Sequence, residues 1–349
     1  MLRPPAVVVL HSRFSAPSTG LDHLARSRRN QFTSVRLNRG VELRDDACWV
    51  ADTLQNPDTR FVPLWRSRCL LERKDGGTIA IYLSPGELTE PDRIQPPTLL
   101  GNDGVREYFA VSVTDSQKDA ILTQFPAARF TDLRRASIDM AAKHAGILAY
   151  AKALHYWQHR HAFCGVCGDS NLLRSAGHRM VCSNEECSRE SYPRIDPAII
   201  VLVTHKDSCL LGRNAKWRPK HFSTLAGFVE PGESLEDAVV REVYEEVQVQ
   251  LTDIRYVSSQ PWPFPASAMC GFYAEAVDMN SGGSEEVEEA RWFTVESLTQ
   301  AVLDDEIRLS PPVSIAFRLL ADWFRKSGGG NLEDLVRRQR AINLSASTC

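Results

Sequence analysis

One stretch of the sequence, residues 227–249, constrains this chain more than any other part. It reads GFVEPGESLEDAVVREVYEEVQV, a turn-rich loop followed by a helical pattern. Ser234, with Asp237 three residues later, has the form of a capping box, so we expect a helix to begin at about Leu235. Apolar residues at helical spacing give this helix one buried side: Leu235, Ala238, Val239, Val243 and Val247.

Three glutamates of the same helix are spaced to share one face. Glu242, Glu245 and Glu246 stand at positions i, i+3 and i+4. Like charges this close repel one another, and hard oxygen ligands of this kind suit Mg²⁺ or Mn²⁺. A solvated acidic helix face is the alternative, but the preceding glycine loop, Glu233 and the Arg241-Glu242 pair favour a metal site.

Four of the nine cysteines form a second pattern. Cys164 and Cys167 make one pair, and Cys182 and Cys187 make another, with fourteen residues between the pairs. Two pairs at this separation can close a tetrahedral thiolate site, as in a zinc ribbon, and four protein ligands would make the Zn²⁺ structural. Four free thiols or two disulfides are the alternatives. The odd number of cysteines favours a reducing compartment over a disulfide framework.

Residues 259–267 read SQPWPFPAS, in which three prolines alternate with Trp262 and Phe264. Proline fixes the backbone, so this segment could hold a rigid aromatic platform for a planar base such as nicotinamide or adenine. A proline-rich buried corner is the alternative. Basic residues near Arg218 could contact phosphates or lie in a solvated loop.

The stretch 227–249 resembles the Nudix box, whose fixed positions it matches as follows: Gly227, Glu233, Arg241, Glu242, Val243, Glu245, Glu246 and Val249. Gln248 stands where that family usually has glycine, which affects the loop after the helix more than the metal site. With the cysteine ribbon before the first strand and SQPWPFPAS after the box, the chain is similar to the NADH pyrophosphatase subfamily.

This resemblance implies an α+β chain whose Nudix fold is an α/β/α sandwich around a mixed sheet. Short β-like runs (CWVAD, TRFVPLW, CLLER, TIAIYL and YFAVSV) predict that the first part is mostly β. Three successive glycines at 328–330 predict a flexible break before the tail. The expected organisation is an N-terminal mostly β domain over 1–130, a connecting helix over 131–160, a zinc ribbon over 161–192, a Nudix domain over 193–325 and a flexible tail over 326–349.

The resemblance also implies hydrolysis of the pyrophosphate bond of NADH, and less well of NAD⁺, to AMP and nicotinamide mononucleotide. It assigns two or three Mg²⁺ or Mn²⁺ to these ligands: Ala226 through its carbonyl, Glu242, Glu245, Glu246 and Glu286. Glu289 is the alternative to Glu286. Either Glu245 or Glu246 could accept the proton from water, and Arg241 is expected to brace the loop against Glu233.

The substrate pocket implied by the resemblance is formed by the following residues: Tyr192, Gln260, Pro261, Trp262, Pro263, Phe264, Pro265, Ala266, Ser267 and Ala316. Some members of the subfamily remove NAD caps from RNA, so decapping as the main activity is one alternative. A non-catalytic nucleotide-binding module is the other. A basic channel leading to the site would favour RNA.

Composition bears on partners and location. The net charge is −3, so no overall basic field points to nucleic acid, and no apolar run is long enough to span a bilayer. Residues 1–40 are rich in Arg and Ser with Asp22 as their one acid, a composition typical of mitochondrial targeting segments. A surface helix over about Leu21–Arg29 is the favoured alternative. We expect a cytoplasmic homodimer that is not secreted and has no membrane partner.

Overall fold

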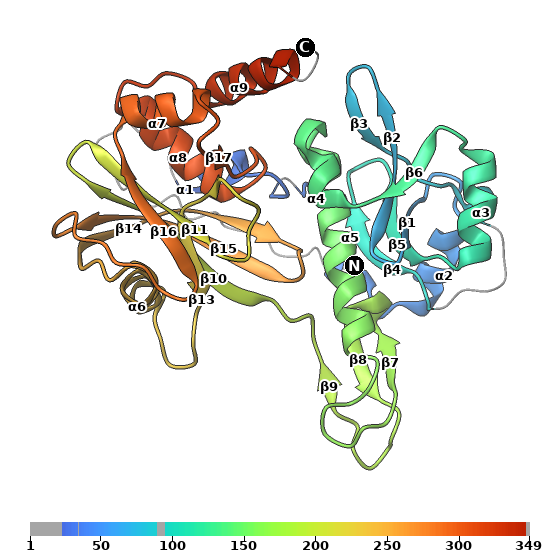
Figure 1. Ribbon diagram of the computed structural model, residues 1–349. Helices are drawn as coiled ribbons and strands as arrows, with labels where there is room; N and C mark the ends of the chain where they lie inside the picture. The colour runs from blue at the N-terminus through green and yellow to red at the C-terminus, as the bar shows by residue number, and fades with distance from the viewer. Residues whose placement is uncertain (1–22, 34, 89–94, 347–349) are drawn as a thin grey trace, which may run out of the picture.

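The computed structural model describes residues 23–33, 35–88 and 95–346. Two sheet-based halves lie side by side, and a ribbon of three short strands projects away from both (Figure 1). The segment considered for targeting falls mainly in residues 1–22, outside the described residues. In the described part of the chain, no helix has the length and apolar character needed to cross a membrane.

The C-terminal half is built on a mixed six-stranded sheet, in the order β14-β15-β10-β11-β16 with β13 paired to β10. Its strands are β10 (Asp196–His205), β11 (Ser208–Asn214), β13 (Leu225–Phe228), β14 (Leu251–Trp262), β15 (Ser267–Ala276) and β16 (Val287–Phe293). Strands β10 and β15 run parallel. The run from Ala198 to Val203 in β10 is buried on both faces, as its continuous apolar sequence predicts.

Helices cover both faces of this sheet and make it a sandwich. One apolar cluster lies between the sheet and α6 (Leu235–Val247). The other lies under α7 (Val295–Leu303), α8 (Ile315–Lys326) and α9 (Leu332–Ala346). Two short strands, β12 (His221–Phe222) and β17 (Arg308–Leu309), pair beside α8. The expected α/β/α arrangement is therefore present.

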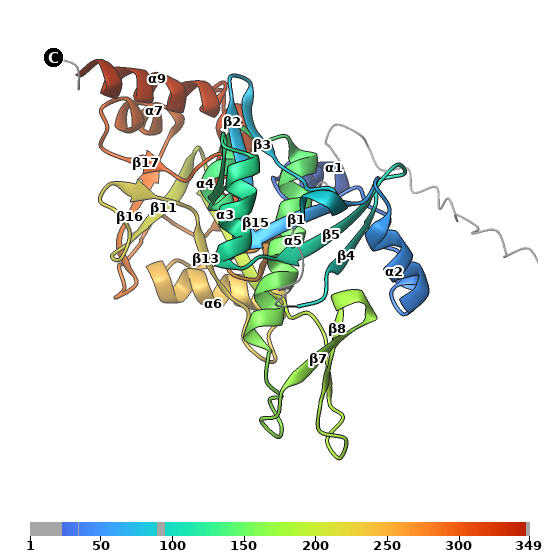
Figure 2. The same ribbon diagram turned by 90° about the vertical axis from the view of Figure 1, so that its right-hand side faces the viewer.

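The N-terminal half contains a second six-stranded sheet, in the order β3-β2-β1-β5-β4 with β6 paired to β2. Its strands are β1 (Arg60–Trp65), β2 (Arg68–Lys74), β3 (Gly77–Ala80), β4 (Thr98–Asn102), β5 (Glu107–Ser112) and β6 (Ala128–Thr131). Strands β1 and β5 run parallel, as β10 and β15 do. The long helix α5 (Ala142–Arg160) packs across this sheet (Figure 2), and α2 (Ala47–Gln55) and α3 (Asp115–Gln124) complete this half.

The projecting ribbon carries the four cysteines (Figure 1). Its strands are β7 (Asn171–Arg174), β8 (Arg179–Cys182) and β9 (Glu190–Ser191), all antiparallel. Few of its side chains are buried, so this segment lacks an apolar core of its own.

The first described segment lies against the C-terminal half. Helix α1 (His23–Arg29) packs beside β14, and the predicted surface helix is thus present at this position. Asn30 donates hydrogen bonds to Ser258 Oγ (3.2 Å) and to the Ser259 carbonyl (2.9 Å). Arg29 pairs with Asp322 of α8 at 3.1 Å. The residues that contact the C-terminal sheet and α8 therefore precede the whole N-terminal sheet in the sequence.

Three expectations from the sequence are wrong. The run CWVAD is not a strand but lies in α2, because the Asp46 side chain accepts a hydrogen bond from the Trp49 amide and caps a helix. The helix expected over 131–160 is interrupted: α4 (Leu133–Ala136) and a 3₁₀ turn (Ser137–Asp139) precede α5. The expected flexible tail forms α9, because Leu332 and Leu335 are buried against the core under α7 and α8.

Candidate active site

Helix α6 positions the three predicted carboxylates. Ser234 Oγ accepts a hydrogen bond from the Asp237 amide at 3.1 Å, and the Asp237 carboxylate accepts one from the Ser234 amide at 3.2 Å. This reciprocal cap starts the helix at Leu235, as predicted. The helix ends at Val247, and the capping residue that follows, Gln248, has a left-handed φ of 60°. Glycine takes this conformation most easily, which explains the preference at this position, and glutamine adopts it here at some cost in strain.

Gly227 allows the helix to approach β13 closely. A Cβ atom at this position would overlap the carboxylate of Glu242. The glutamate therefore lies directly against the backbone of β13 at Gly227, the residue that follows Ala226. Any side chain at residue 227 would displace the carboxylate, so glycine here is a requirement of packing and not of backbone angle.

Arg241 connects the loop and the helix. Its guanidinium pairs with both carboxylate oxygens of Glu233, at 2.5 and 2.9 Å, and donates to the Phe228 carbonyl at 2.9 Å. It also reaches Glu242 and Glu245, each at 3.0 Å. Hydrogen bonds from Arg241 lower the pKa of Glu233 to about 2. Arg241 contacts the loop as expected for a brace, and it supplies part of the positive charge that this acidic face needs.

Glu246 and Glu242 remain insufficiently compensated. Burial raises the pKa of Glu246 to about 8, and the neighbouring charges of Glu242, Glu286 and Glu245 add to this rise. Burial also raises the pKa of Glu242. Glu246 Oε2 is buried and has no hydrogen-bond partner among the described residues. A buried carboxylate oxygen without a partner, surrounded by other carboxylates, fits a divalent cation.

The structure distinguishes between the two candidates for the fourth glutamate. Glu286 accepts a hydrogen bond from Asn214 at 3.2 Å, and its charge acts on both Glu242 and Glu246. Glu289 instead lies near two arginines, at 3.7 Å from one and 3.9 Å from the other. Glu286 therefore faces the carboxylate cluster and Glu289 does not.

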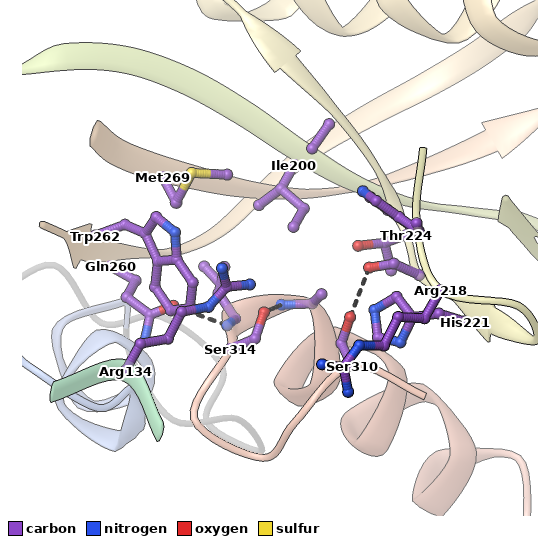
Figure 3. A pocket seen from close by; sticks show the side chains of 15 residues that line it. Arg134, Ile200, Arg218, His221, Thr224, Gln260, Trp262, Met269, Ser310 and Ser314 are labelled. Carbon is purple, nitrogen blue, oxygen red and sulfur yellow. Dashed lines mark hydrogen bonds between the residues drawn. The ribbon is translucent and has the colours of Figure 1, made fainter. Parts of the chain in front are cut away.

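A cavity of about 430 Å³ lies on the other face of β13 from these carboxylates. Ala226 lines this cavity, whereas the next residue, Gly227, faces Glu242. Adjacent residues of a strand point to opposite faces, so a ligand that passes the edge of β13 can reach both sites. Figure 3 shows Trp262 and Arg134 at one end of the cavity and Arg218, with Thr224, at the other.

The cavity is cationic. Its lining contains Arg134, Arg218 and His221 but neither aspartate nor glutamate among the described residues. Burial lowers the pKa of His221, and the two arginines lower it further. Thr224 Oγ1 is buried there without a hydrogen-bond partner in the described part of the chain. An uncharged polar acceptor and two guanidinium groups suit an anionic ligand that carries hydroxyl groups.

The predicted substrate residues separate into different environments. Trp262 and Ala316 line the 430 Å³ cavity. A second cavity, of about 320 Å³, shares Gln260 and Trp262 with the first and is lined by four further predicted residues: Pro261, Pro263, Ala266 and Ser267. Phe264 is partly buried against the N-terminal core, beside Phe32. Pro265 is exposed and lines neither cavity.

Two of the predicted substrate residues have other contacts. The buried amide of Gln260 donates to the carbonyls of Gln31 (3.0 Å) and Val313 (2.7 Å) and accepts from the Ile315 amide (2.8 Å). This side chain holds the start of α8. Tyr192 is exposed on the ribbon, where its hydroxyl donates to Glu190 at 2.6 Å, and it lines neither of the two cavities.

The four cysteines of the ribbon converge. The Sγ atoms of Cys164, Cys167, Cys182 and Cys187 all lie within 4.8 Å of one another, and all four residues are free thiols. The Val166 amide donates to Cys164 Sγ at 3.4 Å. This closeness without a disulfide fits one tetrahedral metal ion. In the described residues, no other group of three or more potential ligand side chains converges in this way.

Two residues of the site were not identified from the sequence. Phe228 is exposed directly after Gly227, and its position after the first residue of the box was the signal that could have indicated it. Arg134 comes from the other half of the chain, so no local pattern connects it with the cavity.

The fold and the carboxylate helix define the class of protein, which is that of the Nudix hydrolases. The family model "NUDIX domain" matches residues 194–311, and the model "NADH pyrophosphatase-like rudimentary NUDIX domain" matches residues 58–157. A crystal structure of a NUDIX hydrolase from Nitrosomonas europaea is similar over 48% of this chain and 93% of that one, with 21% identity and a TM-score of 0.39.

Similarity to curated relatives places the chain in a narrower group among the Nudix hydrolases. The chain is 40% identical over 342 residues to the NAD-capped RNA hydrolase NUDT12 of Macaca fascicularis, covering 85% of this chain and 73% of the relative. It is 43% identical to the NAD-capped RNA hydrolase NudC of Stutzerimonas stutzeri, covering 59% and 74%. The match to human NUDT12 covers 44% of that protein, at 39% identity. The chain therefore belongs to the NUDT12/NudC family of Nudix hydrolases.

Proposed function

We propose that this chain hydrolyses the pyrophosphate bond of NADH, and less well that of NAD⁺, to AMP and nicotinamide mononucleotide. The observation that carries the proposal is the arrangement on the two sides of β13. The partly buried carboxylate of Glu242 lies against Gly227, and a cationic cavity large enough for a nucleoside begins at Ala226. A dinucleotide has its pyrophosphate between two nucleosides, so it can place one nucleoside in the cavity and the phosphates at the carboxylates.

The metal ligands that we propose are the Ala226 carbonyl and the four glutamates at 242, 245, 246 and 286. Mg²⁺ or Mn²⁺ bound there supplies charge neutralisation of the phosphates and a water of lowered pKa. Arg241 fixes the position of the loop relative to the helix through its ion pair with Glu233. Glu245, which is exposed, and Glu246, which is buried, are the two candidates for the group that accepts the proton.

Around the phosphates, the chain's own side chains orient the substrate. The exposed ring of Phe228 follows Gly227 directly, so by strand alternation it lies on the same face of β13 as Ala226, where it is available to stack on a base. Arg218 and Thr224 can bind phosphate or ribose oxygens within the cavity. Ala316 leaves room at the start of α8, where a larger side chain would reduce the cavity.

NAD-capped RNA is the second candidate substrate. Relatives that are 40% and 43% identical are named NAD-capped RNA hydrolases. The cavity also contains two arginines and no carboxylate among the described residues, which suits a substrate with phosphates beyond the pyrophosphate. The chemistry at the carboxylates would be unchanged.

A direct assay tests this function. The purified protein with Mn²⁺ is compared on NADH, NAD⁺, ADP-ribose, a diadenosine polyphosphate and NAD-capped RNA by kcat/KM. We expect NADH or the capped RNA to rank first. A higher value for ADP-ribose or the diadenosine polyphosphate would contradict the proposal.

Charge-removing variants test the carboxylates. Glu242→Gln, Glu245→Gln and Glu246→Gln should each lower kcat for AMP release by orders of magnitude, and double variants should be far from additive because the groups act as a unit. Glu236→Gln, an exposed glutamate on the same helix, is the matched control and should retain activity. Normal rates in all three variants would show that this helix is only a solvated acidic face.

We also propose the division into domains given from the sequence, except for the tail and for the single uninterrupted helix over 131–160, and a structural Zn²⁺ on the four cysteines. A homodimer is proposed from the exposed apolar side chains on and beside the ribbon: Phe163, Val166, Tyr192 and Ile195. In a dimer, Tyr192 could contact a substrate in the partner copy. A cytoplasmic location, or a mitochondrial one directed by the N-terminal segment, remains part of the proposal.

A further inference from the structure

Arg134 belongs to the N-terminal half but lines the cavity of the C-terminal half. It lies in the short helix α4, whose first residue, Leu133, is buried in the N-terminal core. Figure 3 places its guanidinium beside Trp262 at one end of the cavity. Leu133 thus anchors the helix in one half while the next side chain extends into the other.

Arg134 and Trp262 make a cation–π contact. Arg134 Cζ lies 5.2 Å from the centre of the Trp262 ring, within the range of a cation–π interaction. Among the described residues, this guanidinium makes neither an ion pair nor a hydrogen bond. Its donors are therefore available, and its charge lies in a cavity that no carboxylate of the described chain lines.

Trp262 is supported from behind. Its ring makes edge contacts with Phe264 (centroids 5.0 Å apart) and Phe32 (6.1 Å apart). These packed rings leave Trp262 little freedom to move, and Arg134 lies over its face. The guanidinium of Arg134 consequently covers the face of Trp262. A base that stacks at this end of the cavity would contact the guanidinium and not the tryptophan ring.

Hydrogen bonds connect the segment that follows Arg134 to the lining of the cavity. Gln260, at the edge of that cavity, donates to the carbonyl of Gln31 at 3.0 Å. The Gln31 side chain in turn donates to the carbonyls of Ser137 (2.8 Å) and Met140 (3.2 Å). These two carbonyls lie at the interruption between α4 and α5. The break in the expected long helix, which follows Arg134 in the chain, is thus fixed relative to Gln260 in the cavity lining.

We propose that Arg134 is a substrate-contacting residue, which stacks its guanidinium on the base of the bound dinucleotide with Trp262 behind it. Guanidinium groups stack on bases as well as on aromatic side chains, and lysine does not replace arginine in such a stack. This inference rests on the proposed function, which supplies the dinucleotide. It gives the N-terminal half a role in substrate binding through a single side chain.

Kinetics on the full chain test the proposal. Arg134→Ala should raise KM for NADH by about tenfold with little change in kcat, because it removes a binding contact remote from the reacting phosphorus. Arg134→Lys should recover only part of this loss. Arg135→Ala, which removes the neighbouring exposed arginine outside the cavity, should retain the wild-type KM.

Binding measurements keep the test independent of turnover. Titration calorimetry of AMP and of nicotinamide mononucleotide should show about tenfold weaker binding to Arg134→Ala for the product whose base occupies this end of the cavity. Wild-type affinity for both products, or full recovery with lysine, would overturn the stacking role. A wild-type chain that binds AMP through Arg134 but does not cleave NADH would instead contradict the proposed function and leave this inference standing.

Discussion

At the scale of single residues, the main feature is that the protein itself buries one of the proposed metal ligands, Glu246. Glu246 is only 7% exposed, whereas the Glu245 side chain on the same helical face is 59% exposed. The i, i+3, i+4 spacing predicted that three carboxylates share a face, but spacing alone does not determine depth. Depth depends on how closely α6 approaches β13, which Gly227 allows.

Stability should therefore depend on pH through Glu246. Its folded pKa of about 8 lies above an ordinary value of 4.5, so from pH 4.5 to 8 the folded protein holds a proton that the unfolded chain has lost. Metal-free protein should lose stability across this interval as pH rises. Glu246→Gln should be more stable than wild type by on the order of 4 kcal/mol at pH 8, and equal to it below pH 4.5. Urea unfolding with EDTA at several pH values measures this, and a pH-independent difference would contradict it.

The end of α6 offers a second residue-scale prediction. Gln248 occupies the left-handed region, where a side chain is unfavourable. Gln248→Gly should stabilise the protein by about 1 kcal/mol in chemical denaturation. Gln250→Gly, at an exposed position without positive φ, is the control and should be neutral or destabilising by about 0.5–1 kcal/mol. Destabilisation by Gln248→Gly would mean that the glutamine side chain, which lies against Gly282, contributes more than the strain costs.

At the scale of elements, the sequence was most informative where a local pattern is long. The capped helix α6 and the strands β1, β2, β3 and β5 were predicted and are present. The tail was not: the glycines before it do form a turn, with Gly328 and Gly330 at positive φ, but the chain then returns and buries Leu332 and Leu335. Such burial depends on a surface supplied by distant residues, which a local pattern does not contain.

The ribbon is the element whose stability should depend on metal. It has no apolar core, and its four thiols converge, so a bound ion would provide the interactions that keep it folded. Elemental analysis should give about one zinc per chain. Cys182→Ser should lose the zinc and lower the free energy of unfolding by on the order of 3 kcal/mol. Cys48→Ser, at an exposed cysteine outside the ribbon, should change neither quantity. A metal-free protein with an intact ribbon would contradict this prediction.

At the scale of the whole molecule, the two halves repeat one arrangement. Both sheets place a parallel pair at the centre, β1 with β5 and β10 with β15, and each has a hairpin partner on one side and an antiparallel strand on the other. The sequence did not indicate this repeat, because side chains diverge while strand order is retained. Only the C-terminal copy contains the carboxylate helix within the described residues, so the N-terminal copy serves the site through Arg134.

Association of two chains is the prediction at this scale. Light scattering of the purified protein should give twice the mass of one chain. Ile195→Glu, which places a charge among the exposed apolar side chains near the ribbon, should shift the protein toward the mass of one chain. Val105→Glu changes a still more exposed apolar side chain, in the turn between β4 and β5, and should leave the mass unchanged. A wild-type protein with the mass of one chain would rule out the dimer.

The position of the first described segment has a consequence for any attempt to divide the protein. Asn30 and Arg29 bind the second sheet and α8, yet they precede the whole first sheet along the chain. The first described segment thus connects the N-terminal part of the chain to the C-terminal half by non-covalent contacts, in addition to the covalent connection through α5 and the ribbon. A protease that cuts once between α5 and β10 should yield two fragments on a denaturing gel that still elute together under native conditions. Expression of the C-terminal half alone would remove the partner of the Ser258 side chain, Asn30, and one of the two acceptors of the Gln260 amide, the Gln31 carbonyl.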